Sequence, residues 1–277
     1  MVKNLDVCII TGGAGGMGFE TAKLIGNNQK CILVGRNELK LKNAINQLKE
    51  IEIDAEYFIA DICERESIKE LIKFSKEIGN IKTLIHTAGV SPKMDTYERI
   101  FDINACGTII INEEVLPEMK EGGVVLNVSS MASYFVSSEN RPIHLYELAF
   151  KDLDSFKNEF KQMVKDESEV MKCPSAYKIS KNFVNWYSEQ MALKYGKNGI
   201  RVVSISPGTF STPMCKIEGK NSEAYAKMGA LGRVGDPKEI AKMMKFIVSD
   251  ECSYLTGVDI LYDGGTVAAL NARKRNK

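Results

Sequence analysis

The sequence predicts an α/β protein with a doubly wound parallel sheet of about seven strands and helices on both faces. Seven short apolar runs alternate with helical patterns along the 277 residues, and a glycine-rich turn directly follows the first run. Apolar runs bounded by Gly, Asp or Pro are typical of strands buried on both faces, and helical crossovers make such strands parallel.

The candidate strands lie at residues 7–10, 31–34, 57–60, 83–86, 123–128, 202–205 and 258–261. Between them, apolar residues recur at helical spacing. One such stripe comprises Leu41, Ile45, Leu48 and Ile51, and another comprises Ile240, Met243, Met244 and Ile247. We expect a single domain over residues 1–277, because doubly wound domains of this length commonly stay undivided.

The glycine-rich turn runs from Thr11 to Gly18 and leads into a helical pattern. Gly12 permits the tight turn, Gly16 lets the backbone approach a pyrophosphate, and Gly18 allows close helix packing. A strand, a glycine turn and a helix in this order predict a dinucleotide site at the helix N-terminus.

Tyr177 and Lys181 lie four residues apart, so a helix would place them on one face. We expect the Lys181 ammonium to lower the pKa of the Tyr177 phenol, since a nearby positive charge favours the phenolate. Tyr177 would then give or take protons near neutral pH.

These motifs, in this order, resemble those of the short-chain dehydrogenase/reductase family, which carries a Thr-Gly-x-x-x-Gly-x-Gly turn, an Asn, a Ser and a Tyr-x-x-x-Lys. The family's catalytic residues fall on Asn104, Ser130, Tyr177 and Lys181. For the serine, alignment of Asn-Val-Ser-Ser favours Ser130 over the adjacent Ser129. The resemblance implies a Rossmann-type enzyme that interconverts a carbonyl and a secondary alcohol with a nicotinamide cofactor. The Tyr-to-Lys spacing argues against the enoyl reductases of the same superfamily.

The resemblance also implies a set of cofactor-binding residues just after the strands or on the helices that leave them. They are Thr11, Gly12, Gly16, Met17, Gly18, Arg36, Asp61, Ile62, Ala88, Gly89, Tyr177, Lys181, Pro207, Gly208 and Thr212.

Cofactor preference is predicted from the end of the second strand, Gly35-Arg36. An acid there would bind the ribose hydroxyls of NAD, whereas Arg36 can pair with the 2′-phosphate of NADP. We therefore expect NADP(H) to be favoured over NAD(H). The alternative is that Arg36 stacks on adenine or points to solvent.

An insertion at about 134–173 separates Ser130 from Tyr177 by much more than is usual in the family. Its middle has an apolar stripe at helical spacing that comprises Leu153, Phe156, Phe160, Met163 and Val164. We expect this stripe to cover the substrate cleft or a neighbouring subunit, in preference to the flank of its own chain. Some family members that act on steroids and bulky carbonyls have an insertion here, so the resemblance suggests a hydroxysteroid or other bulky hydrophobic substrate. Small ketones and 3-oxoacyl thioesters are the alternatives.

The two histidines lie outside this catalytic set. His86 stands where many family members have Asn, and a buried structural role is favoured over an acid/base role because the set is complete without it. His144 lies in the insertion, where it could contact substrate.

The composition excludes several classes of function. A formal net charge of +1 offers no footprint for nucleic acid. No apolar stretch reaches the about 18 residues that a membrane span needs, and the absence of a signal peptide predicts the cytoplasm. Seven cysteines without Cys-x-x-Cys spacing predict reduced thiols and no metal site. The partners expected are a small-molecule substrate and further copies in a homodimer or homotetramer. A non-catalytic dinucleotide sensor and a structural homo-oligomer are less favoured, because both Tyr177 and Lys181 are intact.

Overall fold

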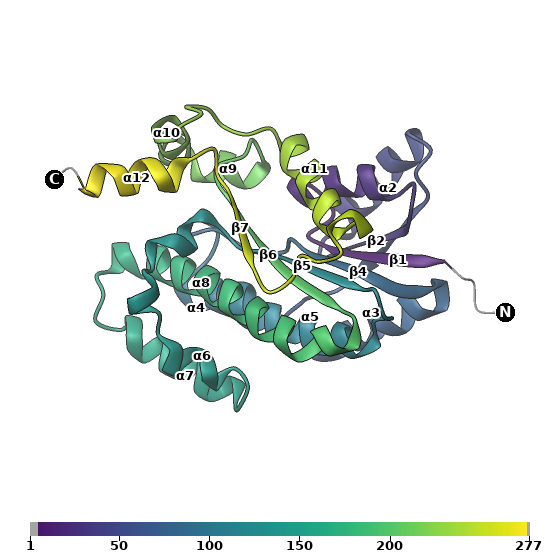
Figure 1. Ribbon diagram of the computed structural model, residues 1–277, viewed down its shortest axis with the longest axis horizontal. Coiled ribbons are helices and arrows are strands. Elements are labelled where there is room, and N and C mark those ends of the chain that lie inside the picture. The colour runs from purple at the N-terminus through teal and green to yellow at the C-terminus, as the bar shows by residue number, and fades with distance from the viewer. Residues whose placement is uncertain (1–4, 276–277) are drawn as a thin grey trace.

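The computed structural model describes residues 5–275 and shows seven parallel strands in the order β3-β2-β1-β4-β5-β6-β7 (Figure 1). The strands are β1 (Asp6–Thr11), β2 (Lys30–Gly35), β3 (Ala55–Ile59), β4 (Asn80–His86), β5 (Val124–Val128), β6 (Arg201–Pro207) and β7 (Asp259–Tyr262). The predicted fold class is confirmed, and each predicted run overlaps one strand. Because the strand order reverses between β1 and β4, a ligand crevice is expected outside their carboxyl ends.

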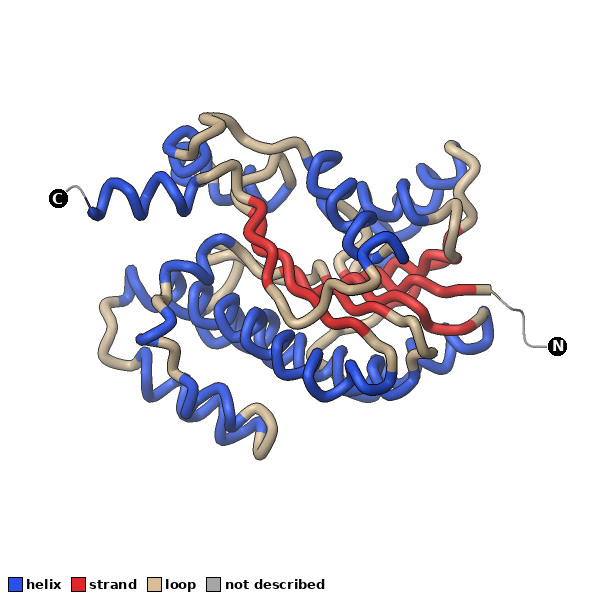
Figure 2. Tube along the Cα trace, in the orientation of Figure 1, coloured by secondary structure: helices blue, strands red, loops and turns tan. Residues whose placement is uncertain are grey.

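Helices cover both faces of this sheet (Figure 2). They are α1 (Gly16–Ile25), α2 (Glu38–Glu50), α3 (Arg65–Ile78), α4 (Tyr97–Phe101), α5 (Gly107–Val115), α6 (Ile143–Leu148), α7 (Leu153–Val164), α8 (Glu169–Tyr195), α9 (Pro213–Glu218), α10 (Lys220–Met228), α11 (Pro237–Val248) and α12 (Thr266–Arg275). A π-helical turn, η1 (Asp102–Cys106), joins α4 to α5. Short 3₁₀ turns are η2 (Leu116–Glu118), η3 (Met131–Phe135), η4 (Ser138–Asn140), η5 (Gly196–Asn198) and η6 (Asp250–Cys252).

The hydrophobic core has two layers, one on each face of the sheet, and β1 shows how they arise. Its residues alternate, so that Val7 and Ile9 join the layer under α3, α5 and α8, while Cys8 and Ile10 join the layer under α1, α2 and α11. Successive side chains of a strand point to opposite faces, so a strand with helices on both sides is apolar throughout.

Helix α2 differs from its predicted stripe at one end. The side chain of Asn37 caps the helix by accepting from the backbone N of Lys40 at 2.9 Å. Leu41 and Leu48 are buried as predicted, but Ile51 lies just beyond the last helical residue and is exposed. The helix ends one residue before the position that periodicity assigned to its apolar face.

The apolar stripe of α7 packs on its own chain, so the expectation that it covers a substrate cleft or a neighbouring subunit is wrong. The Phe160 ring stacks on Phe101 of α4 with the centroids 3.7 Å apart. Phe156 contacts Phe101 and Phe183 of α8, with centroid distances of 4.8 and 4.9 Å. Phe156, Phe160 and Val164 are all fully buried. In Figure 1, α6 and α7 lie on the same side of the sheet as α8.

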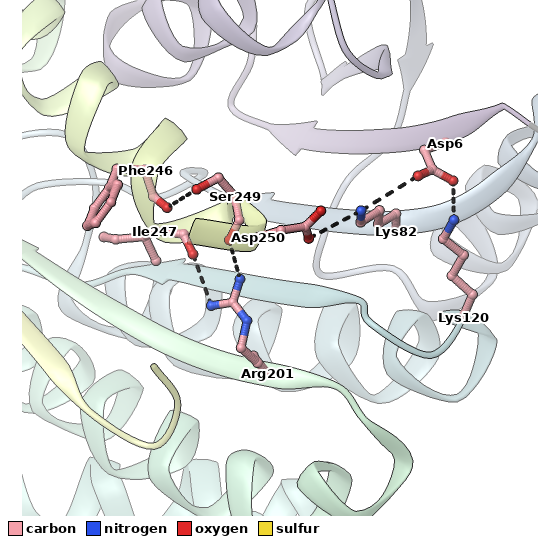
Figure 3. A network of polar contacts seen from close by, with 8 residues as sticks. All are labelled: Asp6, Lys82, Lys120, Arg201, Phe246, Ile247, Ser249 and Asp250. Atoms are coloured by element: carbon pink, nitrogen blue, oxygen red, sulfur yellow. Dashed lines mark hydrogen bonds and ion pairs between the residues drawn. The ribbon is translucent and has the colours of Figure 1, made fainter. Parts of the chain in front are cut away.

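A polar network ties the amino ends of β1, β4 and β6 to the end of α11 (Figure 3). Arg201 donates to the carbonyls of Ile247 and Ser249, each at 3.0 Å, and so satisfies carbonyls at the end of the helix. Lys82 lies 3.4 Å from Asp250 and 3.8 Å from Asp6. This network stabilises the amino ends of the strands, on the side of the sheet away from their carboxyl ends.

Candidate active site

The turn between β1 and α1 is crowded at Gly12 and open at Gly16. A Cβ on Gly12, whose φ is 68°, would lie 2.7 Å from Thr87 Oγ1 and 2.9 Å from the backbone N of Ala88. Gly16, with a φ of 55°, begins α1, and the nearest atom to a Cβ there would be Thr212 Cγ2 at 3.7 Å. No side chain caps this helix, so its first N–H groups are free to bind an anion. The turn therefore fits the phosphates of a dinucleotide.

The other predicted residues of this turn are also in place. A Cβ on Gly18 would lie 2.7 Å from Thr87 Oγ1, so glycine is required for the close approach of α1 to the loop after β4. Met17 packs against the core layer under α1 and α11. Thr11 ends β1 and is fully buried.

Arg36 and Asp61 lie together beyond β2 and β3, which are neighbours in the sheet. The Arg36 side chain is 59% exposed, and its Nη1 lies 3.7 Å from Asp61 Oδ2. Asp61 also accepts from the backbone N of Cys63 at 2.9 Å, which fixes the start of the turn before α3. Ile62, which lies between Asp61 and Cys63 in the chain, is buried. A largely exposed guanidinium at this place can bind a phosphate.

The adjacent serines at the end of β5 have different partners. Ser129 Oγ donates to the backbone carbonyl of Lys181 at 2.7 Å, so this hydroxyl is used inside the protein. Ser130 is the N-cap of η3, and its Oγ accepts from the backbone N of Ala132 at 3.2 Å, which leaves its proton for another acceptor. Ser130 is therefore the serine that is able to donate to a substrate.

Tyr177 lies on α8, and burial raises the pKa of its phenol. A hydrogen bond with the Ser130 side chain lowers that pKa, and the Glu218 carboxylate raises it. The expectation that Lys181 lowers the pKa of Tyr177 is wrong for this structure. The Lys181 ammonium instead donates to the carbonyl of Val128 at 3.0 Å, and burial lowers its own pKa to about 8.

Asn104, Gly89 and Lys181 converge from three different segments. Asn104 lies in the π-helical turn, where its Oδ1 accepts from the backbone N of Val90 and its Nδ2 donates to the Val90 carbonyl, both at 2.9 Å. A Cβ on Gly89 would lie 2.9 Å from Asn104 Oδ1 and 3.2 Å from Lys181 Nζ. Only glycine fits between these two side chains, and a residue without a side chain is what a close approach of another group to the backbone requires.

The loop after β6 reaches back over the glycine-rich turn. Pro207 ends the strand, and the Gly208 backbone donates to the Tyr262 carbonyl at 3.0 Å. Thr212 caps α9 by accepting from the backbone N of Cys215 at 3.3 Å. Its methyl group is the nearest neighbour of the open side of Gly16, so this loop borders the phosphate site.

Glu218 is a site residue that sequence reasoning missed. Its Oε1 accepts from Ser91 Oγ at 2.5 Å and from the backbone N of Lys93 at 3.2 Å, and Lys93 Nζ donates to its backbone carbonyl at 2.7 Å. These bonds fasten α9 to the loop after β4, beside Tyr177. No local motif marks Glu218, because the contact joins residues 127 positions apart.

The two histidines have different surroundings. His86 is buried between Thr11 and Thr108, and burial, together with the positive charge of Lys181, lowers its pKa to about 3. A neutral, fully bonded imidazole fits the structural role favoured from the sequence. His144 lies on α6 with its side chain exposed, and its Nε2 is 4.0 Å from Glu159 of α7.

Three further features bear on the classes excluded from composition. Across residues 5–275, no group of three or more His, Cys, Asp or Glu side chains is arranged to hold a metal ion. All seven cysteines are free thiols. Within the same range, none of the helices combines the length and apolar character needed to cross a membrane.

Comparison with protein families gives two matches that follow each other along the chain. The family model described as short chain dehydrogenase matches residues 6–143, and the model described as Enoyl-(Acyl carrier protein) reductase matches residues 164–267. The interval between the two matches contains most of α6 and most of α7.

Several curated proteins are similar over nearly their whole length. The oxidoreductase YxbG of Bacillus subtilis is 30% identical, with 94% of this chain and 90% of that protein covered. A 3alpha-hydroxysteroid dehydrogenase of Mediterraneibacter gnavus is 29% identical, with 95% and 97% covered. The 3-oxoacyl-[acyl-carrier-protein] reductase FabG of Thermotoga maritima is 26% identical, with 94% and 97% covered.

Among solved structures, a short chain dehydrogenase of Burkholderia cenocepacia in complex with NADP has the same fold. It superposes with a TM-score of 0.73 at 18% identity and covers 94% of this chain and 96% of that one.

Proposed function

We propose, from the premise that this chain belongs to the short-chain dehydrogenase/reductase family, that it is an NADP(H)-dependent enzyme interconverting a carbonyl group and a secondary alcohol. The observation that carries the proposal is the convergence of Ser130, Tyr177, Lys181 and Asn104 beside a glycine turn that has room for phosphates. These are the groups needed to bind a substrate oxygen and move its proton.

In the proposed reaction, Ser130 donates a hydrogen bond to the substrate oxygen and Tyr177 exchanges a proton with it. Burial raises the pKa of Tyr177 further above its ordinary value of about 10, so the phenol keeps its proton at neutral pH and can act as the acid in carbonyl reduction. Lys181 Nζ lies beside Gly89, where it can bind a ribose hydroxyl, and Asn104 fixes a water in the role that its family counterpart has. The nicotinamide ring, when bound, supplies or accepts the hydride.

The proposed preference for NADP(H) rests on Arg36 and its surroundings. Its guanidinium is largely exposed, and the only carboxylate paired with it among the described residues is Asp61, at the long distance of 3.7 Å. The nearby Glu38 is held by Lys42 Nζ at 2.8 Å and by the Tyr57 hydroxyl at 3.2 Å, so that carboxylate is already bonded within the protein. Arg36 is the charge best placed to pair with a 2′-phosphate.

For the substrate, we propose a hydroxysteroid or another bulky hydrophobic carbonyl compound. The named activity of the M. gnavus relative supports this class, and that of the T. maritima relative supports 3-oxoacyl thioesters as the alternative. Phe135, at the end of the 3₁₀ turn that Ser130 caps, pairs with Tyr225 of α10 at 6.2 Å between ring centroids, and both residues are 39% exposed. Such a pair offers apolar area to a flat, bulky ligand.

A substrate panel tests this proposal. Steroids, bulky and small ketones, sugars, polyols and acyl thioesters are supplied in turn with NADPH or NADP, and with NADH or NAD, and kcat/KM is measured. We expect the largest kcat/KM for a steroid or bulky ketone with the phosphorylated cofactor. A larger kcat/KM for a 3-oxoacyl thioester would replace the substrate class and keep the reaction, while turnover of no compound in the panel would contradict the reaction itself.

The cofactor prediction has its own variant. Replacing Gly35 with Asp and Arg36 with Leu should shift the ratio of kcat/KM values toward NAD(H) by at least about tenfold, or about 1.4 kcal/mol. The phosphate loses a cation and meets a carboxylate. Equal use of both cofactors by the unmodified enzyme would show that Arg36 does not select for the phosphate.

We also propose that residues 1–277 form one domain with an insertion at about 134–173, and that the enzyme is a cytoplasmic homodimer or homotetramer. Since the stripe of α7 is buried within its own chain, the subunits would have to join through another surface. Light scattering of the purified chain measures the number of subunits.

A further inference from the structure

A buried chain of hydrogen bonds leads from β1 through His86 to the backbone of Asn104. Thr11 Oγ1 lies 2.7 Å from His86 Nδ1, and His86 Nε2 lies 3.1 Å from Thr108 Oγ1. Thr108 Oγ1 in turn donates to the Asn104 carbonyl at 2.8 Å. None of these four residues is more than 1% exposed, so bulk water does not compete for the bonds.

The direction of each bond in this chain follows from the number of protons available. Thr108 gives its single hydroxyl proton to Asn104, so the bond between Thr108 and His86 requires a proton on Nε2. A neutral imidazole then has a bare Nδ1, which accepts from the Thr11 hydroxyl. Thr11 Oγ1 also accepts from the backbone N of Ala88 at 3.3 Å. The ring therefore has one tautomer, with a partner at each nitrogen.

Asn104 needs such support because it lies in a π-helical turn. Here the backbone N of Gly107 donates to the carbonyl of Asp102, five residues earlier, in place of the four-residue spacing of an α-helix. Turns of this kind are rare, occur mostly as single turns within α-helices, and are frequent at functional sites. The Thr108 hydroxyl, oriented by His86, bonds the carbonyl of Asn104 in the middle of the turn.

The loop after β4 holds the other end of the same residue. The backbone of Val90 both donates to and accepts from the Asn104 side-chain amide. The segment that begins at His86 therefore fixes Asn104 twice, once through Thr108 at the backbone and once through Val90 at the side chain.

We propose that His86 is a positioning residue for Asn104, and that it acts through Thr108 to hold the π-helical turn in the geometry that the reaction uses. The proposal rests on the proposed function, in which Asn104 belongs to the catalytic set. A histidine suits this place because its two ring nitrogens lie on opposite sides of the ring and can join β1 to α5.

Two substitutions of His86, by Asn and by Gln, test the bonds of its two ring nitrogens one at a time. The amide of Asn reaches about as far as Nδ1, and that of Gln about as far as Nε2, because Gln has one more methylene group. His86→Asn can keep the bond to Thr11 but not the bond to Thr108, whereas His86→Gln can keep a donor to Thr108. We expect His86→Gln to retain more of kcat than His86→Asn.

The sharpest variant removes only the relaying hydroxyl. Thr108→Val is close in shape and should lower kcat by about tenfold to a hundredfold, as small displacements of reacting groups do, while the cofactor dissociation constant in a fluorescence titration changes by less than about twofold. Thr83→Val is the matched control. Thr83 is fully buried on β4, and its hydroxyl has no partner among the described residues, so kcat should be unchanged. Thermal unfolding of both variants measures any loss of folded protein.

A double-mutant cycle with Asn104→Ala separates positioning from mere packing. If Thr108 acts through Asn104, Thr108→Val should change kcat by less than about twofold in the Asn104→Ala background. A full additive loss there, or equal kcat values for Thr108→Val and Thr83→Val, would overturn the role of His86. An unchanged kcat for Asn104→Ala alone would also overturn it, but by removing Asn104 from the proposed site. If Asn104→Ala lowers kcat and Thr108→Val does not, the proposed function stands and only this inference is overturned.

Discussion

Ser129 and Ser130 are neighbours in sequence, yet their hydroxyls have different partners on α8. Ser129 bonds the backbone of Lys181, and Ser130 faces Tyr177. We predict that Ser130→Ala lowers kcat by about a hundredfold or more, as the loss of a substrate-orienting donor does. Ser129→Ala should instead lower the free energy of unfolding by about 0.5–1.5 kcal/mol, the usual worth of one buried hydrogen bond, and keep most of kcat.

Steady-state kinetics and urea unfolding of both serine variants measure these effects. If Ser129→Ala loses more of kcat than Ser130→Ala, the substrate-binding role moves by one residue. Each variant serves as the control for the other, because the change in size is the same.

The ammonium of Lys181 should limit the enzyme at alkaline pH. Burial lowers its pKa to about 8 from the usual 10.5, so it holds its proton below this pH and loses it as the pH rises. The value of kcat/KM for carbonyl reduction should therefore fall as the pH rises through about 8. Lys181→Arg should lower the plateau, because the guanidinium has a different shape, and remove this alkaline decline, because arginine stays charged.

The matched control for this pH profile is Lys178→Arg, on the same helix but outside the proposed set. It should leave the decline near pH 8 in place. The same alkaline decline in wild type and Lys181→Arg would assign it to another group.

At the scale of elements, α7 stabilises its own subunit. Phe156 is fully buried between Phe101 and Phe183, so Phe156→Ala should lower the free energy of unfolding by about 3–5 kcal/mol through the cavity it leaves. Tyr254→Ala, at a fully exposed aromatic residue, is the control and should change stability by less than about 0.5 kcal/mol. Denaturant unfolding and light scattering of the same samples separate stability from assembly. Dissociation of an oligomer by Phe156→Ala without loss of stability would contradict this packing.

The element that was placed wrongly from the sequence shows what periodicity can predict. The apolar spacing of α7 indicated a helix with one buried face, and such a helix is present. It could not indicate the covering surface, because the aromatic rings of Phe101 and Phe183 lie on segments 55 and 27 positions from Phe156 in the chain. The strands were easier, since the apolar runs inside the sheet are buried by helices on both faces whatever their neighbours are, whereas the edge strands β3 and β7 are partly exposed.

Across the whole molecule, the candidate catalytic residues and the stabilising polar network lie at opposite ends of the strands. The candidate site gathers at the carboxyl ends of the strands, while the network of Arg201, Lys82 and Asp6 ties the amino ends together (Figure 3). Motifs contiguous in the sequence, such as the glycine turn and the Tyr177–Lys181 pair, could be predicted. The fastening of α9 by Glu218 and the bonding of Asn104 through His86 could not, because both depend on contacts that only the folded chain creates.

The most direct test of the proposed carbonyl chemistry is NADPH oxidation by wild type and Tyr177→Phe with the best carbonyl substrate of the panel. The variant removes only the phenolic oxygen, so the NADPH dissociation constant should stay within about threefold, while kcat should fall by about a hundredfold to ten-thousandfold, the usual contribution of a general acid. A Tyr177→Phe enzyme that keeps a tenth or more of the wild-type kcat would contradict the account, because Tyr177 would then not be the acid.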